Sequence, residues 1–211
     1  MPILFGAAYS VYVRAVRLVL AEKAVAYRLE EVDVFAPGGP PAEYRQRHPF
    51  ARIPAFEHDG FRLYECGAIT RYIDEAFPGT ALQPPDPRPR ARMNQVIGVL
   101  DSYAYRPLVW DIFVERIRAP ANGRVPDEAR IRAALPLAGT CLHALGALLG
   151  DNEFLAGGAL TLADLHAAPI FAYFVMTGEG RDLLRDVPAL AEWWRRMAAR
   201  DSMAATRSPL E

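Results

Sequence analysis

Hydrophobic and polar residues alternate with two different periods in the first part of the chain. The run VRAVRLVLAEKA (13–24) places Val13, Val16, Val19 and Leu20 at helical spacing. An apolar run, PILFGAA, precedes this predicted helix, and the alternating run AYRLEEVDV follows it as a second strand. PPAEYRQRH begins with proline and carries an early glutamate, which predicts a short helix. The pattern up to this point is strand, helix, strand, helix.

A hairpin and a third helix complete the first segment. Asp59-Gly60 lies between two alternating runs in PAFEHDGFRLYE, and an Asp-Gly pair in that context is a strong hairpin signal. CGAITRYIDEAF then returns to helical spacing. The predicted order is βαβαββα, so we expect residues 1–77 to form an α/β domain.

The rest of the chain shows only helical patterns. Five prolines lie between Pro78 and Pro89, which predicts a stiff linker over 78–90 without helix or central strand. A long helix, expected to bend near Pro107, follows in the sequence. The predicted helices cover residues 91–117, 126–150, 160–177 and 187–200. We therefore predict an all-helical domain over 91–211.

Composition excludes several classes of protein. The chain is 52% hydrophobic, which is enough for a packed core, and no run of about 18 apolar residues occurs. The N-terminal residues do not resemble a secretory signal, so we expect a cytoplasmic protein without a membrane span. A net charge of −1 gives no general attraction for nucleic acid.

Two cysteines, Cys66 and Cys141, are too few for a disulfide framework or a cysteine zinc site. Lys23 is the only lysine among many arginines, a bias that indicates GC-rich coding and a bacterial source.

Two features near the hairpin suit a peptide-like ligand. Pro54 heads the hairpin, where a cis Ile53–Pro54 bond would turn the backbone of Ile53 outward to pair with an extended ligand. A plain proline at a strand start is the alternative. At Glu65-Cys66 a strand passes into a helix, whose first N–H groups bind carboxylates, while Glu65 would hold an amino group. Together these features suit an α-amino-acid head group.

The order of elements and three segments resemble the glutathione transferase family, most closely its phi- and theta-like, serine-type classes. HPFARIPAFEHDGFRLYECGAITRYI looks like a block of the phi class, and FGAAYSVYVRAVRLVL parallels its first turn. LAGGALTLADLHAAPI is similar to the family's helix-capping segment, in which Thr161 and Asp164 form a capping box. The resemblance implies a thioredoxin-like domain that binds glutathione, a helical domain that supplies a pocket for an apolar electrophile, and a homodimer without metal.

The resemblance also implies a catalytic residue. Ser10 falls on the serine whose hydroxyl would donate a hydrogen bond to the glutathione sulfur and hold it as thiolate, helped by the positive end of the first helix. A plain N-cap role is the alternative for Ser10. Tyr9, whose hydroxyl is more acidic, is the competing candidate.

Binding residues follow from the same resemblance. Asp101 would reach across the dimer to the γ-glutamyl amino group, or lie simply on the surface. The remaining implied contacts are Arg52, Ile53, Pro54, Glu65 and Cys66 for glutathione, and Tyr12, Phe35 and Phe113 for the second substrate.

The chain departs from the phi class at two places. Gly39 and Pro40 stand where that class has a basic pair for the glycine carboxylate, which leaves His48 or Arg45 as candidates. Cys66 stands where a serine is usual, and since a thiol is a weak donor, Cys66→Ser is expected to tighten glutathione binding. These departures keep two alternatives open: a glutathione-dependent peroxidase or thiol transferase, in which Cys66 has a redox role, and a non-catalytic protein-interaction module.

Overall fold

The computed structural model describes residues 1–211 and divides the chain into two compact units. The first unit contains Met1–Gln83 and Asp201–Glu211, and the second contains Pro84–Arg200. The sequence-based boundaries assigned the last segment to the helical domain, but it belongs to the first unit. There α9 (Asp201–Ala205) packs on α1 (Val11–Glu22), and Arg14 of α1 binds both Glu211 and the Met203 carbonyl.

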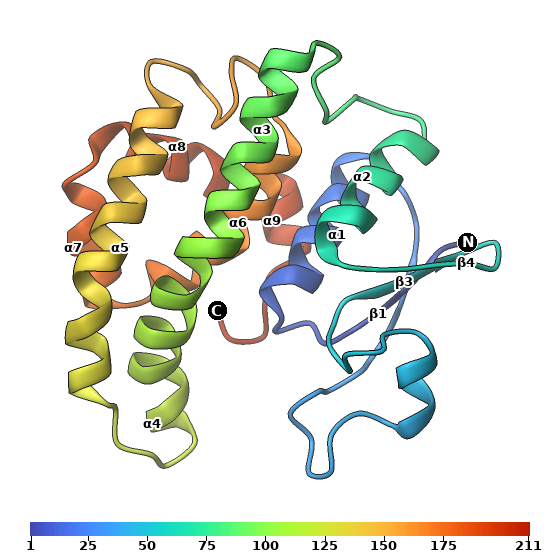
Figure 1. Cartoon of the computed structure of the whole chain (residues 1–211), viewed down its shortest axis with the longest axis horizontal. Coiled ribbons are helices and arrows are strands. Elements are labelled where there is room, and N and C mark those ends of the chain that lie inside the picture. The colour runs from blue at the N-terminus through green and yellow to red at the C-terminus, as the bar shows by residue number, and fades with distance from the viewer. The chain divides into compact units, whose positions relative to one another are not determined.

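A four-stranded mixed sheet forms the centre of the first unit (Figure 1). Its order is β2-β1-β3-β4, with β1 parallel to β2 and antiparallel to β3. Asp59 and Gly60, with φ of 50° and 82°, close the β3–β4 hairpin, as their sequence predicted. The strands are β1 (Ile3–Phe5), β2 (Arg28–Glu30), β3 (Ala55–His58) and β4 (Phe61–Tyr64).

The two faces of the sheet have different covers. Phe5 and its cross-strand partner Ala55 pack with Tyr44 of the 3₁₀ helix η1 (Ala42–Gln46). On the opposite face Phe56 meets Tyr72 of α2 (Cys66–Ala76), with ring centroids 6.2 Å apart. α1 and α2 pack on each other. This arrangement confirms the predicted thioredoxin-like α/β domain.

The second unit is entirely helical, as predicted. Its first helix begins at Pro87, inside the expected linker, because proline is tolerated in a first helical turn and Asp86 occupies the N-cap. From Leu100 the chain continues as π-helix, and Pro107 lies within this stretch. The elements are α3 (Pro87–Val99), η2 (Leu100–Ala104), η3 (Arg106–Arg118), α4 (Ala119–Ala121), α5 (Glu128–Leu149), α6 (Leu162–Phe174), α7 (Gly178–Arg185) and α8 (Pro188–Ala198).

Helix α6 is the core of the second unit, and all of its residues are buried. The predicted capping box is present: Thr161 caps the helix, and Asp164 accepts bonds from the Thr161 amide at 2.9 Å and the Trp193 indole at 2.9 Å. Phe171 lies edge-on against Trp193, so the aromatic residues here serve packing. By length and composition α5 alone would be able to cross a membrane, a test that core helices of water-soluble proteins also pass.

Candidate active site

Ser10 lies at the start of α1, immediately after the loop that leaves β1. Its extended backbone (φ −75°, ψ 130°) and its Oγ, which accepts a bond from the Val13 amide at 3.4 Å, make it the N-cap of α1. Its hydroxyl donates to no protein atom, so the proton is available to a ligand. The positive end of α1 favours negative charge at this position.

The hydroxyl of Tyr9 is engaged elsewhere. It donates to Oδ1 of Asp33 over 2.6 Å, in the segment that follows β2. The same oxygen accepts a bond from the Phe35 amide at 2.9 Å. The two candidates for thiol activation therefore differ. The Ser10 hydroxyl is free to donate a hydrogen bond to a ligand, whereas the Tyr9 hydroxyl already donates to Asp33.

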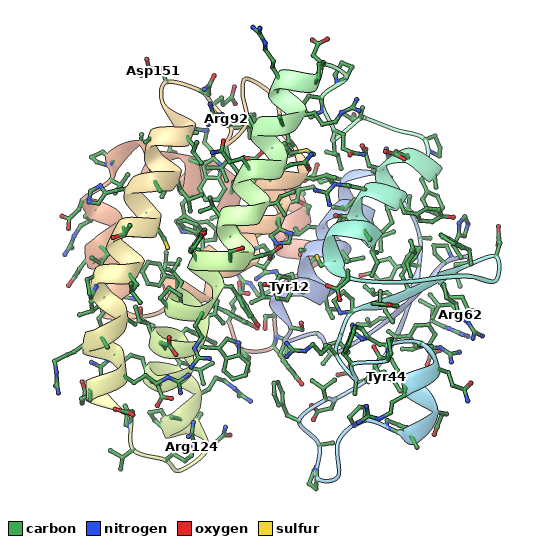
Figure 2. The ribbon with its side chains drawn as sticks, in the orientation of Figure 1. Tyr12, Tyr44, Arg62, Arg92, Arg124 and Asp151 are labelled. Atoms are coloured by element: carbon green, nitrogen blue, oxygen red, sulfur yellow. The ribbon has the colours of Figure 1, made fainter.

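The Ile53–Pro54 peptide bond is cis, as the hairpin sequence and the resemblance predicted. The β1–β3 ladder begins at Ala55, which pairs with Phe5, so Ile53 lies beyond the ladder. Tyr44 of η1 (Figure 2) donates its hydroxyl to the Arg52 carbonyl at 2.8 Å, which fixes the segment before Pro54.

Glu65 stands at the N-cap of α2 with an unusual backbone. Its φ of 74° and ψ of 117° are rare for a residue with a side chain, and such strain, which costs about 1–3 kcal/mol, clusters at functional sites. The Glu65 side chain makes no capping bond and is exposed. The first turn of a helix leaves N–H groups without partners inside the helix, and these attract carboxylates. The turn thus combines an acidic side chain with an anion-binding helix start.

The thiol of Cys66 is bonded to the neighbouring helix α1. Its side chain is buried, and Sγ donates to the Tyr12 carbonyl of α1 at 3.5 Å. The sequence predicts a weak hydrogen bond from this thiol to the ligand, whereas in the structure the thiol donates to α1. Only the backbone of Cys66 remains a candidate contact.

The residues considered for the glycine carboxylate differ in charge and exposure. His48 is 2% exposed and its Nδ1 has no hydrogen-bond partner. Burial lowers the pKa of His48, an effect that nearby Glu65 opposes and nearby Arg52 reinforces, so the ring is neutral near pH 7. Arg45 donates to the Pro49 carbonyl at 3.4 Å. Arg52 is exposed and its guanidinium has no protein partner, so its charge is available to a ligand.

The three residues expected at a second-substrate pocket lie in different environments. Tyr12 is half-buried on α1 (Figure 2), and Phe35 is 64% exposed in the segment after β2. Phe113 is 1% exposed and stacks on Tyr173 inside the second unit, with ring centroids 4.2 Å apart. Because Phe113 has almost no accessible surface, we assign it to the core and not to a pocket.

Asp101 lies in η2 and pairs with a buried histidine. Nε2 of His166, from α6, is 2.8 Å from Oδ1 of Asp101, and 43% of the Asp101 side chain remains exposed. Asp101 is thus not a simple surface carboxylate, because the protein holds it in one orientation.

Comparison with known proteins decides the family. Residues 4–81 match the glutathione S-transferase N-terminal domain, and residues 103–201 match the C-terminal domain. Glutathione S-transferase F13 from Arabidopsis thaliana is 30% identical to the chain over 199 residues, which are 93% of this chain and 90% of the relative. The chain belongs to the glutathione S-transferase family.

Solved structures of glutathione transferases have the same fold. Glutathione transferase F7 from Populus trichocarpa superposes with a TM-score of 0.86 at 29% identity, covering 98% of this chain and 97% of that one. The theta class glutathione S-transferase from Xanthomonas axonopodis pv. citri, solved with glutathione bound, superposes with a TM-score of 0.83 at 27% identity, covering 100% and 99% of the two chains.

Within this glutathione S-transferase, sequence reasoning missed two site residues. Asp33 and His166 each hold a candidate residue, Tyr9 and Asp101, that is far away in sequence. Nothing in the local pattern around Asp33 or His166 indicates these contacts. Only the preference of a buried imidazole for a hydrogen-bonded partner indicates the contact of His166, and no such rule applies to the exposed Asp33.

Proposed function

We propose that this enzyme conjugates the glutathione thiolate to electrophilic, largely apolar small molecules, and that Ser10 activates the thiol. The observation that carries the proposal is the uncommitted proton of the Ser10 hydroxyl at the N-terminus of α1. That hydroxyl donates a hydrogen bond to the glutathione sulfur and stabilises the thiolate. The pKa of the thiol, about 8.5 when free, is thereby lowered, and the thiol proton is released to solvent. The thiolate then attacks an electrophilic carbon, and the leaving group departs with its bonding electrons.

Glutathione binds on the first unit in an extended form. The backbone of Ile53, beyond the sheet ladder and before cis-Pro54, pairs with the peptide. The N-terminus of α2 at Cys66 takes the γ-glutamyl carboxylate, and Glu65 takes its amino group. Arg52 takes the glycine carboxylate, because its guanidinium is exposed and without a protein partner. Tyr12 and Phe35 contribute apolar surface for the electrophile.

A homodimer completes the proposal. Asp101, oriented by His166 and 43% exposed on its side chain, reaches the γ-glutamyl amino group of the partner subunit's ligand. Light scattering at micromolar concentration should give about twice the chain mass of 23.4 kDa. A monomer mass would remove this role for Asp101.

The class and source are also proposed. The serine at the start of α1 and the glutathione S-transferase F13 relative support a phi-like, serine-type class. The arginine and alanine bias supports a bacterial source. The relationship to glutathione S-transferases supports a cytoplasmic location.

Substitution of Ser10 tests the mechanism. Ser10→Ala should lower kcat/KM by about 10²-fold with any electrophile, the lower range for loss of a positioned proton donor. Ser10→Gly is the matched variant, because glycine keeps the N-cap within a few tenths of a kcal/mol but has no hydroxyl. Ser10→Thr should restore activity. If Ser10→Ala is nearly normal and Tyr9→Phe is inactive with every electrophile, the activating residue is Tyr9.

The head-group site has its own test. Glu65→Gln should raise KM for glutathione about tenfold with little change in kcat, since the contact is equal in ground and transition states. A glutathione analogue without the α-amino group should bind wild type and Glu65→Gln equally. A Glu65→Gln penalty that persists with the analogue would mean that Glu65 does not contact the amino group.

The alternative functions have less support. A thiol transferase that uses Cys66 needs an accessible thiol, and this thiol is buried and bonded to the Tyr12 carbonyl. A non-catalytic module would have no need for strain at Glu65 or for an uncommitted hydroxyl at Ser10. Retention on immobilised glutathione separates the non-catalytic module from the enzymes.

A further inference from the structure

Asp33 joins the hydroxyl of Tyr9 to the backbone of Phe35. The Tyr9 hydroxyl donates to Asp33 Oδ1 at 2.6 Å, and the Phe35 amide donates to the same oxygen at 2.9 Å. The rings of Tyr9 and Phe35 lie 6.1 Å apart at an interplanar angle of 31°. Tyr9 directly precedes Ser10 in the chain, so these contacts tie Phe35 to the residue next to the proposed catalytic serine.

We propose that Tyr9 and Asp33 form a latch that holds Phe35 as a contact surface for aromatic electrophiles. The inference deepens the proposed function and rests on it. Tyr9 is then a positioning residue that determines specificity, and it does not act on the sulfur.

The segment that carries Phe35 needs such a tether. It contains three prolines and two glycines between Ala36 and Pro41, and Gly38 and Gly39 have φ of 87° and 77°. A side chain on either glycine would meet no atom within 4 Å, so this part of the segment is not packed. The nearest buried anchors are Val32 before the segment and Tyr44 after it. The carboxylate of Asp33 therefore links the segment to the loop that precedes α1, through a charge-assisted hydrogen bond from Tyr9.

The exposure of Phe35 indicates what the latch serves. The Phe35 side chain is 64% exposed and adds little buried apolar surface to the core, yet its ring contacts that of Tyr9. Aromatic rings prefer offset or tilted contact with another ring, which a planar electrophile supplies. A short alkyl electrophile has no ring to place there. The latch should thus affect aromatic electrophiles more than small alkyl ones.

The test compares two electrophiles at saturating glutathione, chlorodinitrobenzene and iodomethane. Tyr9→Phe and Asp33→Ala should each lower the chlorodinitrobenzene-to-iodomethane ratio of kcat/KM about fivefold, mainly through KM for chlorodinitrobenzene. KM for glutathione should not change. In a Phe35→Ala background, Tyr9→Phe should have no further effect, because the group that it positions is gone.

The matched control is Tyr72→Phe, which removes a hydroxyl that also makes one hydrogen bond, to His58 at 2.9 Å, on α2. It should leave the ratio unchanged. Melting temperatures report whether each variant is folded, and Asp33→Ala tests the latch if Tyr9→Phe is not. Ser10→Ala should lower kcat/KM for both electrophiles by the same factor. Failure of the proposed function can therefore be told apart from failure of the latch.

Two results would overturn the latch. One is an unchanged electrophile ratio in folded Tyr9→Phe and Asp33→Ala. The other is an equal loss with both electrophiles in Tyr9→Phe, together with a raised pKa of the bound thiol in its ultraviolet titration, which would make Tyr9 the activating group.

Discussion

The only lysine of the chain forms a buried ion pair that should be important for the stability of the first unit. Lys23 Nζ lies 3.1 Å from Asp74 Oδ1, and the two side chains are 2% and 4% exposed. The ammonium also donates to the Asp74 carbonyl at 2.9 Å and to the Thr80 carbonyl at 3.3 Å, so all three donors are used. Lys23 thereby joins the end of α1 to α2 and to the segment that leaves it.

Removal of the charge by Lys23→Met should be costly. Loss of one partner of a buried pair costs about 3–5 kcal/mol because the other charge stays buried. Asp74 would keep its bonds from the Leu82 amide at 2.8 Å and from Gln83 at 3.1 and 3.2 Å, so we expect the lower end, about 3 kcal/mol. For a chain of this size that corresponds to a melting temperature lower by roughly 6–12 °C.

Urea unfolding at one fixed protein concentration, followed by circular dichroism, measures the change in the free energy of unfolding. Arg28→Met is the matched control, since the Arg28–Glu30 pair spans 2.7 Å but is 56% and 44% exposed, and it should cost less than about 1 kcal/mol. The double variant Lys23→Met/Asp74→Asn should cost less than the sum of the single variants. A Lys23→Met variant within about 1 kcal/mol of wild type, or strict additivity, would refute the reasoning.

His48, Asp164 and Cys66 provide three further tests. Burial lowers the pKa of His48, so the contribution of its neutral ring to stability is fully present above the ordinary value of about 6.5 and is lost as the pH falls through the folded-state pKa. The urea concentration at the unfolding midpoint should therefore fall as the pH is lowered from about 6.5. The decrease should be less steep in His48→Asn. Asp164→Ala should destabilise the fold by about 3 kcal/mol or more, because donors from Leu155, Thr161 and Trp193 lose their acceptor. Tryptophan fluorescence in urea measures the change, and a cost below about 1 kcal/mol would contradict the expectation. Cys66→Ser should leave KM for glutathione nearly unchanged, because its side chain bonds to α1, whereas a marked tightening would put that side chain in the glutathione site.

The sequence by itself determined the features that depend on neighbours along the chain. Hydrophobic periods of two and of about 3.6 residues distinguish strands from helices, and Asp59-Gly60 favours the positive φ values that a tight hairpin needs. The capping box of Thr161 and Asp164 is equally local, since the two residues are three positions apart. The N-cap position of Ser10 and the strand-to-helix turn at Glu65 follow for the same reason.

Only the tertiary structure decided which side chains have partners. Helical spacing shows that Phe113 lies on a helix, but its burial against Tyr173 depends on a helix sixty residues later. The thiol of Cys66 and the hydroxyl of Tyr9 are both directed by residues from other elements, Tyr12 and Asp33. The last segment of the chain joins the first unit through Arg14, a contact between residues 197 positions apart. Such contacts form when distant elements pack, and no local period or turn residue encodes them, because hydrogen-bond partners are chosen by proximity in space.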